Sequence, residues 1–374
     1  MSCRNSKILF GVCALEKKVS TKRMQHLLQE VNKFHEFEFV MFSDQMLLET
    51  PVEQWPSCEV LLCFHSSGFP IRRARRYQQR LEGCGLLRVS LQDLRVQKQV
   101  LLNREKVYSL LANLKVPVPC NNFIAVKRGR GHRFPSPTTK LWDTEDALFY
   151  SSSNSTVQQL VEKDYESGNG GENGGENGNG NGNVGESVPF HPLVKQRVDK
   201  PLVEKPIDAN NHHIRIYYPK RGGCRTLFRK VDNKCSELHP QLNDGVRTKG
   251  SYIYEPLLTT VNHMDIKVYI VGCQADYVYA ETRKSPAVSG DVERTSEGLE
   301  KRQRQVALTE LELQICKKIA LGFRQTVCGF DILRLGPNDS RVCDVNGFSM
   351  AKGYEPFFVN AGQVIRAQVL SAFQ

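Results

Sequence analysis

The chain of 374 residues is 40% hydrophobic and carries 51 Lys and Arg against 40 Asp and Glu, a formal net charge of +11 at pH 7. This size predicts two or three folded domains, and the basic excess suits an anionic partner: nucleic acid, a membrane surface or a highly phosphorylated small molecule. No apolar run is long enough to span a bilayer, and the twelve cysteines include no CxxC pair, which argues against a membrane protein and a zinc site. Because the cysteines are scattered through apolar segments, we predict reduced thiols in a cytosolic protein.

Residues 1–95 are predicted to form an N-terminal α/β domain. Apolar runs over 7–15, 37–43 and 58–66 predict strands. The cap candidates Ser20 and Thr21, followed by apolar residues at helical spacing, predict a helix after the first strand. Charged residues follow the first run at once, where a secretory signal would have a small-residue cleavage site, so the run is expected to be a strand. Strands and helices in this order indicate a small α/β unit.

Residues 96–374 are predicted to form a second domain, a mostly antiparallel sheet with flanking helices. A helix is expected over 96–120, where the segment VPVPC ends it. The Gly/Asn/Glu-rich segment over 167–187 is predicted to be a disordered insertion, because it cannot bury enough surface to offset chain entropy. Further strands are predicted over 201–207, 214–219, 224–231, 251–258 and 265–272, then a helix over 302–325, two strands within 327–348 and a helix over 360–372.

Two aspartates and an asparagine interrupt the last two predicted strands. Asp344 and Asn346 are two residues apart and share one face of a strand, while Asp331 lies on the preceding strand across a Gly-Pro-Asn-Asp turn. Two carboxylates and an amide oxygen suit Mg²⁺, whose remaining positions would go to water and phosphate. Exposed polar residues beside a turn would show the same spacing, but the apolar neighbours Phe330 and Val345 argue against that alternative.

Basic residues also interrupt apolar strands in this half of the chain. A cation inside a strand is costly unless it meets an anion, so several cations aimed at one cleft would make a polyphosphate site. The candidates are Lys205, Arg229, Lys230, Lys267, Arg283 and Lys284, with Lys17 and Lys18 at the end of the first strand. Each one alone is equally well explained by a salt bridge or a solvated face.

Two further segments have an ordinary interpretation beside a functional one. The segment YIYEPLL ends a predicted strand at Glu255, where backbone groups could meet a purine edge, but many edge strands end in this way. The run RRARR over 72–76 fits a helix surface better than a nucleic-acid patch. No nucleic-acid partner is therefore expected.

Nine motifs in this order resemble the diphosphoinositol pentakisphosphate kinases, members of the ATP-grasp superfamily. They are VEQWPSCEVLLCFHSSGFP, NREKVYSLL, VEKP, LFRKV, GSYIYEP, DIKVYIVG, ETRKSPAVSGDVERTSEG, QTVCGFDILR and VCDVNGFS. The resemblance implies an α/β and α+β chain in which an ATP-grasp fold, with antiparallel sheets and flanking helices, follows the N-terminal α/β domain. Larger family members carry a histidine-phosphatase-like domain, and no RHG-type signature occurs here, so a kinase domain alone is expected.

The resemblance also implies an activity and a set of site residues. The enzyme would use ATP and Mg²⁺ to phosphorylate inositol hexakisphosphate or 5-diphosphoinositol pentakisphosphate at the 1-position phosphate, forming a diphosphate. By motif, the implied nucleotide contacts are Arg104, Lys205, His212, Arg229, Lys267 and Ser285, with Glu255, Pro256, Leu257 and Leu258 at the adenine, Asp265 at the ribose, and Asp331, Asp344 and Asn346 at Mg²⁺. The implied substrate contacts are Lys17, Lys18, Arg229, Lys230, Lys267, Arg283, Lys284, Arg294, Arg302, Ser349 and Lys352.

Among these residues, Arg229, Lys267 and Arg283 are expected to carry the catalysis, by offsetting repulsion between two polyanions and stabilising charge on the transferring group. Two alternatives remain open. A carboxylate–amine ligase of the ATP-grasp type would need fewer cations in its acceptor pocket. An inactive module that binds inositol phosphates or RNA would be expected to lack a metal ligand or Lys205, and the sequence retains them all.

Overall fold

The computed structural model describes residues 6–119, 199–219, 222–242, 246–247, 250–296, 298 and 300–374, together with the backbone of three strands between 124 and 198. The insertion predicted over 167–187 lies outside these residues. The helices are α1 (Glu16–Val19), α2 (Lys22–Val31), α3 (Asp44–Leu48), α4 (Ile71–Gly83), α5 (Leu94–Val96), α6 (Arg104–Asn113), α8 (Glu310–Phe323) and α9 (Glu355–Ser371), with short helical segments η1 (Val52–Gln54), η2 (Gln97–Leu101) and η5 (Val261–His263).

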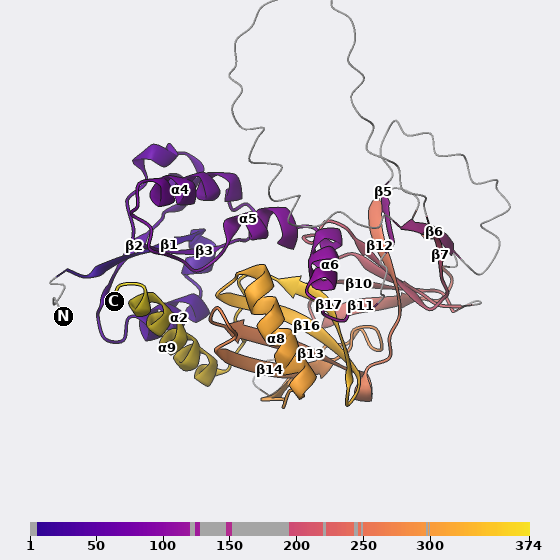
Figure 1. Cartoon of the computed structure of the whole chain (residues 1–374). Helices are drawn as coiled ribbons and strands as arrows, with labels where there is room; N and C mark the ends of the chain where they lie inside the picture. Colours follow the sequence, from indigo (N-terminus) through magenta and orange to yellow (C-terminus); the bar gives the residue numbers. More distant parts are fainter. Residues whose placement is uncertain are drawn as a thin grey trace, which may run out of the picture.

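The strands fall into a parallel sheet near the N-terminus and antiparallel sheets in the rest of the chain (Figure 1). The strands are β1 (Ile8–Ala14), β2 (Phe37–Met41), β3 (Val60–Phe64), β4 (Val89–Ser90), β5 (Ile124–Lys127), β6 (Ala147–Ser151), β7 (Val194–Val198), β8 (Leu202–Pro206), β9 (Ile214–Tyr217), β10 (Cys224–Val231), β11 (Lys234–His239), β12 (Ser251–Pro256), β13 (Met264–Val271), β14 (Tyr277–Lys284), β15 (Gln303–Arg304), β16 (Val327–Gly336) and β17 (Asp339–Asn346).

The N-terminal unit is a four-stranded parallel sheet in the order β2-β1-β3-β4, covered by helices on both faces. Of the two predicted cap residues, Thr21 caps α2, since its side-chain oxygen accepts a hydrogen bond from the Met24 N–H at 3.3 Å. On one face Phe10 packs in the same cluster as α2, and on the other Leu61 packs with α4. A parallel sheet buried on both faces accounts for the nearly continuous apolar runs of these strands.

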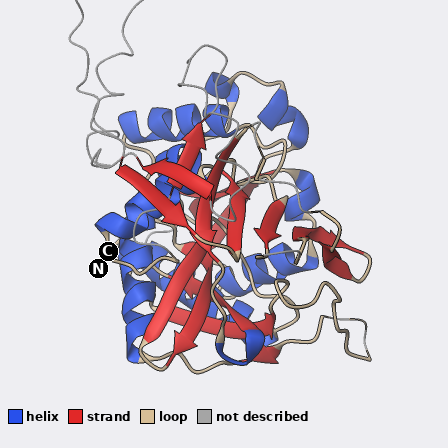
Figure 2. Ribbon diagram, turned by 90° about the vertical axis from the view of Figure 1, so that its right-hand side faces the viewer, coloured by secondary structure: helices blue, strands red, loops and turns tan. Residues whose placement is uncertain are grey.

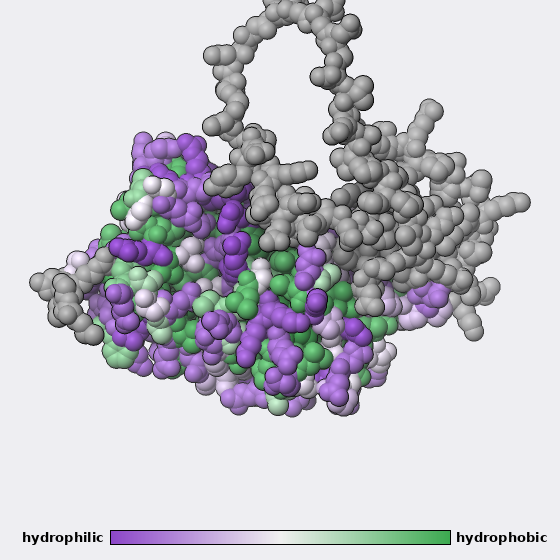
Figure 3. Space-filling model, in the orientation of Figure 1, coloured by the Kyte–Doolittle hydropathy of each residue, from purple (hydrophilic) through white to green (hydrophobic). Residues whose placement is uncertain are grey.

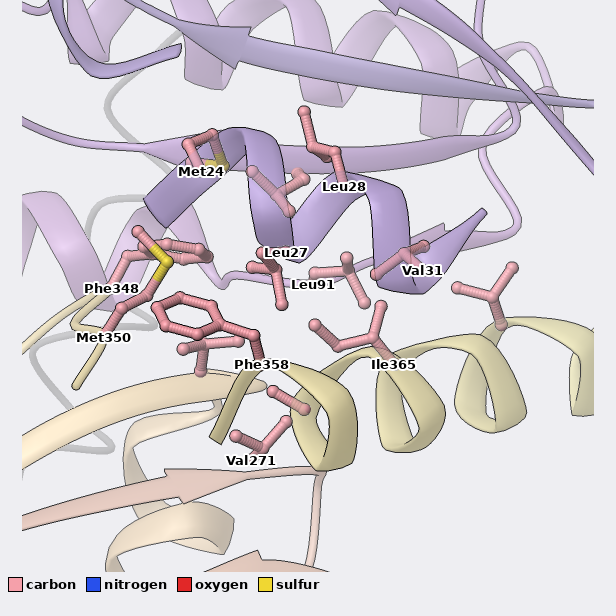
Figure 4. Close-up of a cluster of buried hydrophobic side chains, with 14 of the residues drawn as sticks. Met24, Leu27, Leu28, Val31, Leu91, Val271, Phe348, Met350, Phe358 and Ile365 are labelled. Atoms are coloured by element: carbon pink, nitrogen blue, oxygen red, sulfur yellow. The ribbon is translucent and has the colours of Figure 1, made fainter. Parts of the chain in front are cut away.

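The last helix of the chain, α9, returns to this N-terminal unit and lies beside α2 (Figure 1). Leu27 of α2 belongs to the same buried cluster as Phe358 and Ile365 of α9 (Figure 4). An ion pair closes the contact at its edge, where Arg366 Nε donates to Glu36 Oε2 at 2.9 Å. The core of the N-terminal unit is thus completed by the end of the chain.

The rest of the described structure contains three antiparallel sheets, of which the smallest pairs only β6 and β7. A six-stranded sheet has the order β11-β10-β9-β8-β12-β5 and a five-stranded sheet the order β15-β14-β13-β16-β17. Helices α6 and α8 cover one face of the five-stranded sheet, where Val268 and Phe330 pack with Ile319 of α8. Figure 2 shows the strands at the centre of the molecule with helices around them. The predicted antiparallel arrangement with flanking helices is confirmed.

The structure corrects several predicted bounds. The single helix predicted over 96–120 is divided into α5, η2 and α6, because the Asn103 side chain accepts from the Lys106 N–H at 3.1 Å and caps a new helix. The helix predicted from residue 302 begins only at Glu310, where Thr309 and Glu312 form a capping box. The final helix begins at 355 rather than 360, and β11 and β14 were not predicted as strands.

The visible surface mixes hydrophilic and hydrophobic residues over both halves of the molecule (Figure 3). Within the described part of the chain, none of the helices combines the length and the apolar character needed to cross a bilayer.

Candidate active site

The five-stranded sheet presents a charged row on the face opposite its helices. Lys267 of β13 lies directly opposite Asp331 of β16, and Asp331 lies opposite Asp344 of β17. The alternate residues of β13, Ile266 and Val268, point into the core beneath α8. Since directly opposed residues share a sheet face, the side chains of this row converge on one surface, as their period-two spacing predicts.

A β-bulge makes this arrangement possible on β17. Ile332 pairs with Val342 whereas Asp331 pairs with Asp344, so Cys343 is an extra residue in the ladder. Because of this extra residue, Val342 belongs to the buried core while Asp344 lines a cavity. In an unbroken strand these two residues would face the same side.

A cavity of about 900 Å³ separates the charged row from the six-stranded sheet, and a smaller one of about 290 Å³ adjoins it. Predicted site residues that line the larger cavity are Arg104, Lys205, His212, Arg229, Lys230, Glu255, Pro256, Leu257, Leu258, Asp265, Lys267, Arg283, Lys284, Ser285, Arg302, Asp331, Asp344, Asn346 and Lys352. Lys18 and Ser349 line only the smaller one.

Two predicted residues, Lys17 and Arg294, line neither cavity. The Lys17 ammonium instead donates to the Ser67 carbonyl at 2.7 Å. The Arg294 guanidinium donates to the Gly298 carbonyl at 2.5 Å and to the Asn233 side chain. The structure therefore does not bring these two cations together with the rest.

Lys205 of β8 lies in a buried hydrogen-bonded network that joins β8 to α6, β12 and β17. Its ammonium forms an ion pair with Glu255 and donates to the Tyr108 hydroxyl and the Cys343 carbonyl, each at 3.1 Å. The Tyr108 hydroxyl in turn donates to Glu255 Oε2 at 2.6 Å. Burial acts to lower the pKa of Lys205, but Glu255 and Asp344 outweigh it and raise that pKa above its ordinary value. The amine is thus held as a cation beside the cavity.

Arg104 holds the loop that carries His212. Its Nη1 donates to the carbonyls of Pro206, Asp208 and Asn211 at 2.7, 2.9 and 3.1 Å. The guanidinium is almost fully buried at the end of β8. The predicted nucleotide contact therefore also shapes the backbone of this loop.

His212 and Arg229 contact each other at the opposite wall of the cavity. Arg229 Nη2 lies 2.9 Å from His212 Nε2. Burial and the neighbouring Arg229 guanidinium both lower the pKa of His212. The imidazole is therefore neutral near pH 7, with Nε2 accepting from the guanidinium.

Asp265 is the most strongly perturbed carboxyl group of the cavity. It is 9% exposed, and its Oδ1 has no hydrogen-bond partner among the described residues. Burial raises the pKa of Asp265 to about 6, against the attraction of Arg283 opposite it on β14. An unpartnered, buried carboxylate oxygen facing a cavity suits a ligand hydroxyl, which would supply the missing donor.

Cations dominate the smaller cavity. Lys267, Arg283, Arg302 and Lys352 line both cavities and form the boundary between them. Arg302 is held by a hydrogen bond to Glu300 at 2.9 Å and by an ion pair with the buried Glu281, whereas Lys352 has no ionic partner in the described part of the chain. Burial, then Arg302, lowers the pKa of Lys352. Such a set is suited to a polyanion.

A glycine gives these side chains room. Gly329 of β16 lies opposite Asn346, and a Cβ there would lie 2.7 Å from Ser349 Cβ and 3.6 Å from Lys267 Cε. Only a residue without a side chain lets both groups lie over the strand at this point.

Comparisons with known proteins bear on this geometry. Residues 8–101 match the family model described as the diphosphoinositol pentakisphosphate kinase 2 N-terminal domain. The chain is 37% identical over 369 residues to the inositol hexakisphosphate and diphosphoinositol-pentakisphosphate kinase VIP1 of Arabidopsis thaliana, an alignment that covers 98% of this chain and 29% of that protein. The chain is therefore similar to diphosphoinositol pentakisphosphate kinases over nearly its whole length. It is also 34% identical to the correspondingly named kinase 2 of Homo sapiens, over 96% of this chain and 24% of that one.

The chain spans less than a third of the length of these diphosphoinositol pentakisphosphate kinases. Among solved structures, the ATP-grasp ligase PsnB in complex with a minimal precursor superposes with a TM-score of 0.50 at 12% identity, covering 98% of this chain and 99% of that one. At this identity the likeness concerns the fold alone. The predicted ATP-grasp fold is confirmed.

Sequence reasoning missed two site residues that the structure brings in. Tyr108 lies on α6 among apolar residues, so its spacing shows only a buried helix face. Arg23 of α2 lines the smaller cavity but follows Lys22 in a basic stretch that is typical of a solvated helix end. The motif NREKVYSLL contains Tyr108 without showing its role, and Arg23 lies outside the nine motifs. Both roles depend on contacts across the fold.

Proposed function

We propose that this chain is an ATP-dependent kinase that phosphorylates inositol hexakisphosphate, 5-diphosphoinositol pentakisphosphate or both at the 1-position phosphate, forming a diphosphate. The observation that carries the proposal is the cation-lined smaller cavity that adjoins the larger cavity across Lys267, Arg283 and Arg302. Related proteins named inositol hexakisphosphate and diphosphoinositol-pentakisphosphate kinases support the substrate class. Ten free cysteines in the described part of the chain agree with a reducing, cytosolic location.

In this proposal the larger cavity binds the nucleotide. The end of β12, from Glu255 to Leu258, would meet the adenine edge, and Asp265 would accept from a ribose hydroxyl. Lys205 and the pair formed by His212 and Arg229 would face the phosphates. The unpartnered Asp265 oxygen supports this orientation, because a hydroxyl donor would complete its hydrogen bonding.

The donor set on β16 and β17 fits Mg²⁺. Asp331, Asp344 and Asn346 offer two carboxylates and an amide oxygen at one wall of the cavity. No group of three His, Cys, Asp or Glu suited to a metal ion occurs among the described residues, so the site resembles those in which Mg²⁺ keeps waters and takes further ligands from phosphates. When bound, the ion would neutralise charge on the donor phosphates.

The acceptor atom is a phosphate oxygen that is already anionic at pH 7, so no strong general base is needed. What the reaction requires is alignment of two polyanions and relief of their repulsion. Lys267 and Arg283 would supply this from the boundary between the two cavities, and Arg229 from the wall of the larger cavity. The transferred phosphoryl group would leave the ATP γ-position and join the acceptor phosphate oxygen, with ADP as the other product.

A kinase assay tests the proposal. Purified chain, ATP and Mg²⁺ are incubated with each inositol phosphate, and the product is identified by NMR. We expect a new diphosphate at the 1-position, abolished by Asp344→Asn and retained by Asp339→Asn, since Asp339 lies on the same strand outside both cavities. A diphosphate at another position would overturn the regiochemistry, and retained turnover in Asp344→Asn would overturn the metal assignment.

The same assay separates the alternatives. An ATP-grasp ligase would release phosphate from ATP only with a carboxylate and an amine present. An inactive module would bind the inositol phosphate without forming product. The number of cations lining the smaller cavity favours the kinase over the ligase.

A further inference from the structure

The smaller cavity has one end that the nucleotide cavity does not share. Lys18, Thr21, Arg23 and Phe64 line the smaller cavity alone, and they come from α1, the start of α2 and the end of β3. None of these four residues lines the larger cavity. Groups that bind there would contact parts of an acceptor that do not react.

Arg23 is the charged group at this end that has no assigned role. Its side chain is half-buried, and it forms no hydrogen bond, ion pair or ring contact with any described residue. The next residue, Met24, is fully buried in the core, so the backbone that carries Arg23 is held firmly at the rim of the cavity. A half-buried, unpartnered guanidinium beside other cations is stabilised when an anion joins it.

The nearest cations lack carboxylate partners as well. The Lys18 ammonium lies 5.4 Å from the centre of the Phe64 ring and pairs with no acidic side chain in the described structure. Burial, then Arg23, lowers the pKa of Lys18, and Arg23 also contributes to the lowered pKa of Lys352. Arg23 therefore lies close enough to both lysines for its charge to act on each of them. One multivalent anion would relieve the repulsion that Arg23 exerts on them.

We propose that Arg23 is a substrate-recognition residue of this chain, which binds a non-reacting phosphate of the inositol polyphosphate acceptor together with Lys18. A guanidinium presents paired N–H donors that match two oxygens of one phosphate, which a lysine ammonium cannot do. The inference rests on the proposed function. The proposed contact between Arg23 and the acceptor lies away from ATP. Through this contact the chain would distinguish acceptors by the number of phosphates on the inositol ring.

The test compares three variants of the whole chain: Arg23→Gln, Arg23→Lys and the control Lys22→Gln. Lys22 is the adjacent residue on α2, is exposed and lines neither cavity. Steady-state kinetics are measured with inositol hexakisphosphate and with ATP as the varied substrate. Calorimetry measures binding of inositol hexakisphosphate without ATP, and a thermal melt confirms folding.

We expect Arg23→Gln to raise the acceptor KM and Kd about tenfold or more, as for loss of a charge-assisted hydrogen bond, and to leave the ATP KM unchanged. For an acceptor with fewer phosphates, Arg23→Gln should reduce the affinity by a smaller factor. Arg23→Lys should recover part of the affinity for inositol hexakisphosphate. If Arg23→Gln and Lys22→Gln give the same acceptor KM and Kd, the inference is overturned but the proposed kinase activity is not. If the unmutated chain neither binds nor phosphorylates the acceptor, the proposed function fails first, and the inference with it.

Discussion

The Lys267 ammonium donates to Asp331 Oδ2 at 3.0 Å, across two directly opposed positions of β13 and β16. Both side chains line both cavities. A cation suited to phosphate and a carboxylate suited to Mg²⁺ therefore neutralise each other in the ligand-free site. When nucleotide and metal bind, Lys267 would contact phosphate and Asp331 would contact the metal in place of this ion pair. The ion pair thus holds both side chains in place until the ligands arrive.

Replacing Lys267 by alanine should impair the use of both substrates. Because the ammonium lies at the shared boundary, Lys267→Ala should lower kcat/KM for ATP and for the acceptor by roughly 10²- to 10³-fold, as for loss of one donor that stabilises transition-state charge. The control is Lys317→Ala on the exposed side of α8. A fall in kcat/KM for only one of the two substrates would contradict the position of Lys267 at the boundary of both cavities.

Removing the Tyr108 hydroxyl should weaken nucleotide binding and stability together. Tyr108→Phe leaves Lys205 and Glu255 with one partner fewer in a buried network, at a cost of about 1–3 kcal/mol in unfolding free energy. We expect a raised ATP KM with little change in the acceptor KM, because the network lies at the larger cavity.

The matched control is Tyr77→Phe. Tyr77 is also buried and donates to the Pro56 carbonyl, but it lies in the core of the N-terminal unit. Chemical denaturation should show both variants destabilised, whereas kinetics should separate them. An equal change in ATP KM for the two variants would show that Tyr108 acts through stability alone.

Adding one methyl group to β16 should disturb the acceptor side of the site. In Gly329→Ala the new Cβ meets Ser349 Cβ at 2.7 Å, so the strand or the loop must move, and overpacking of this kind costs about 1–3 kcal/mol. We expect lower melting temperature and a raised acceptor KM. Gly336→Ala on the same strand meets nothing within 4 Å and should change neither. Similar behaviour of both variants would rule out the close approach as the cause.

The perturbed Asp265 makes stability depend on pH. Its folded-state pKa of about 6 lies above the ordinary 3.8, so the folded protein binds this proton more tightly than the unfolded chain. Stability should therefore fall as pH rises from about 4 to about 6, by roughly 3 kcal/mol from this group. Asp265→Asn should remove the fall, being more stable than the unmutated chain above pH 6 and similar to it below pH 4.

Urea unfolding of the two proteins at several pH values measures this difference. Other carboxyl groups titrate in both proteins and cancel in the comparison. Asp339→Asn serves as the control, because Asp339 is half-exposed and pairs with Arg341 at 2.9 Å. A difference between Asp265→Asn and the unmutated chain that stays constant with pH would contradict the raised pKa.

Local patterns predicted the elements that carry the charged row. Asp344 and Asn346 were predicted to share a strand face, and Asp265 and Lys267, two residues apart on β13, follow the same rule. Side chains two residues apart share a face whatever the rest of the chain does, so this inference needs no tertiary contact. The cap at Thr21 is local in the same sense.

The bulge at Cys343 is a different case. Period-two alternation predicts Val342 on the side of Asp344, yet the structure buries Val342 and exposes Asp344 to the cavity. The extra residue allows the Cys343 carbonyl to accept from Lys205 on another sheet. The position of this bulge depends on contacts with distant segments, and the residues of the strand itself do not indicate those contacts.

The sequence by itself determined which residues share a face, where α2 begins, and, through the resemblance of its motifs, the family to which the chain is similar. Only the tertiary structure decided that α9 closes the core around α2, that Tyr108 ties Lys205 to Glu255, and that Arg23 joins Lys18 at one cavity. The first set depends on backbone geometry over a few residues, which sequence spacing encodes directly. The second depends on contacts between distant segments, which form only when the whole core is packed.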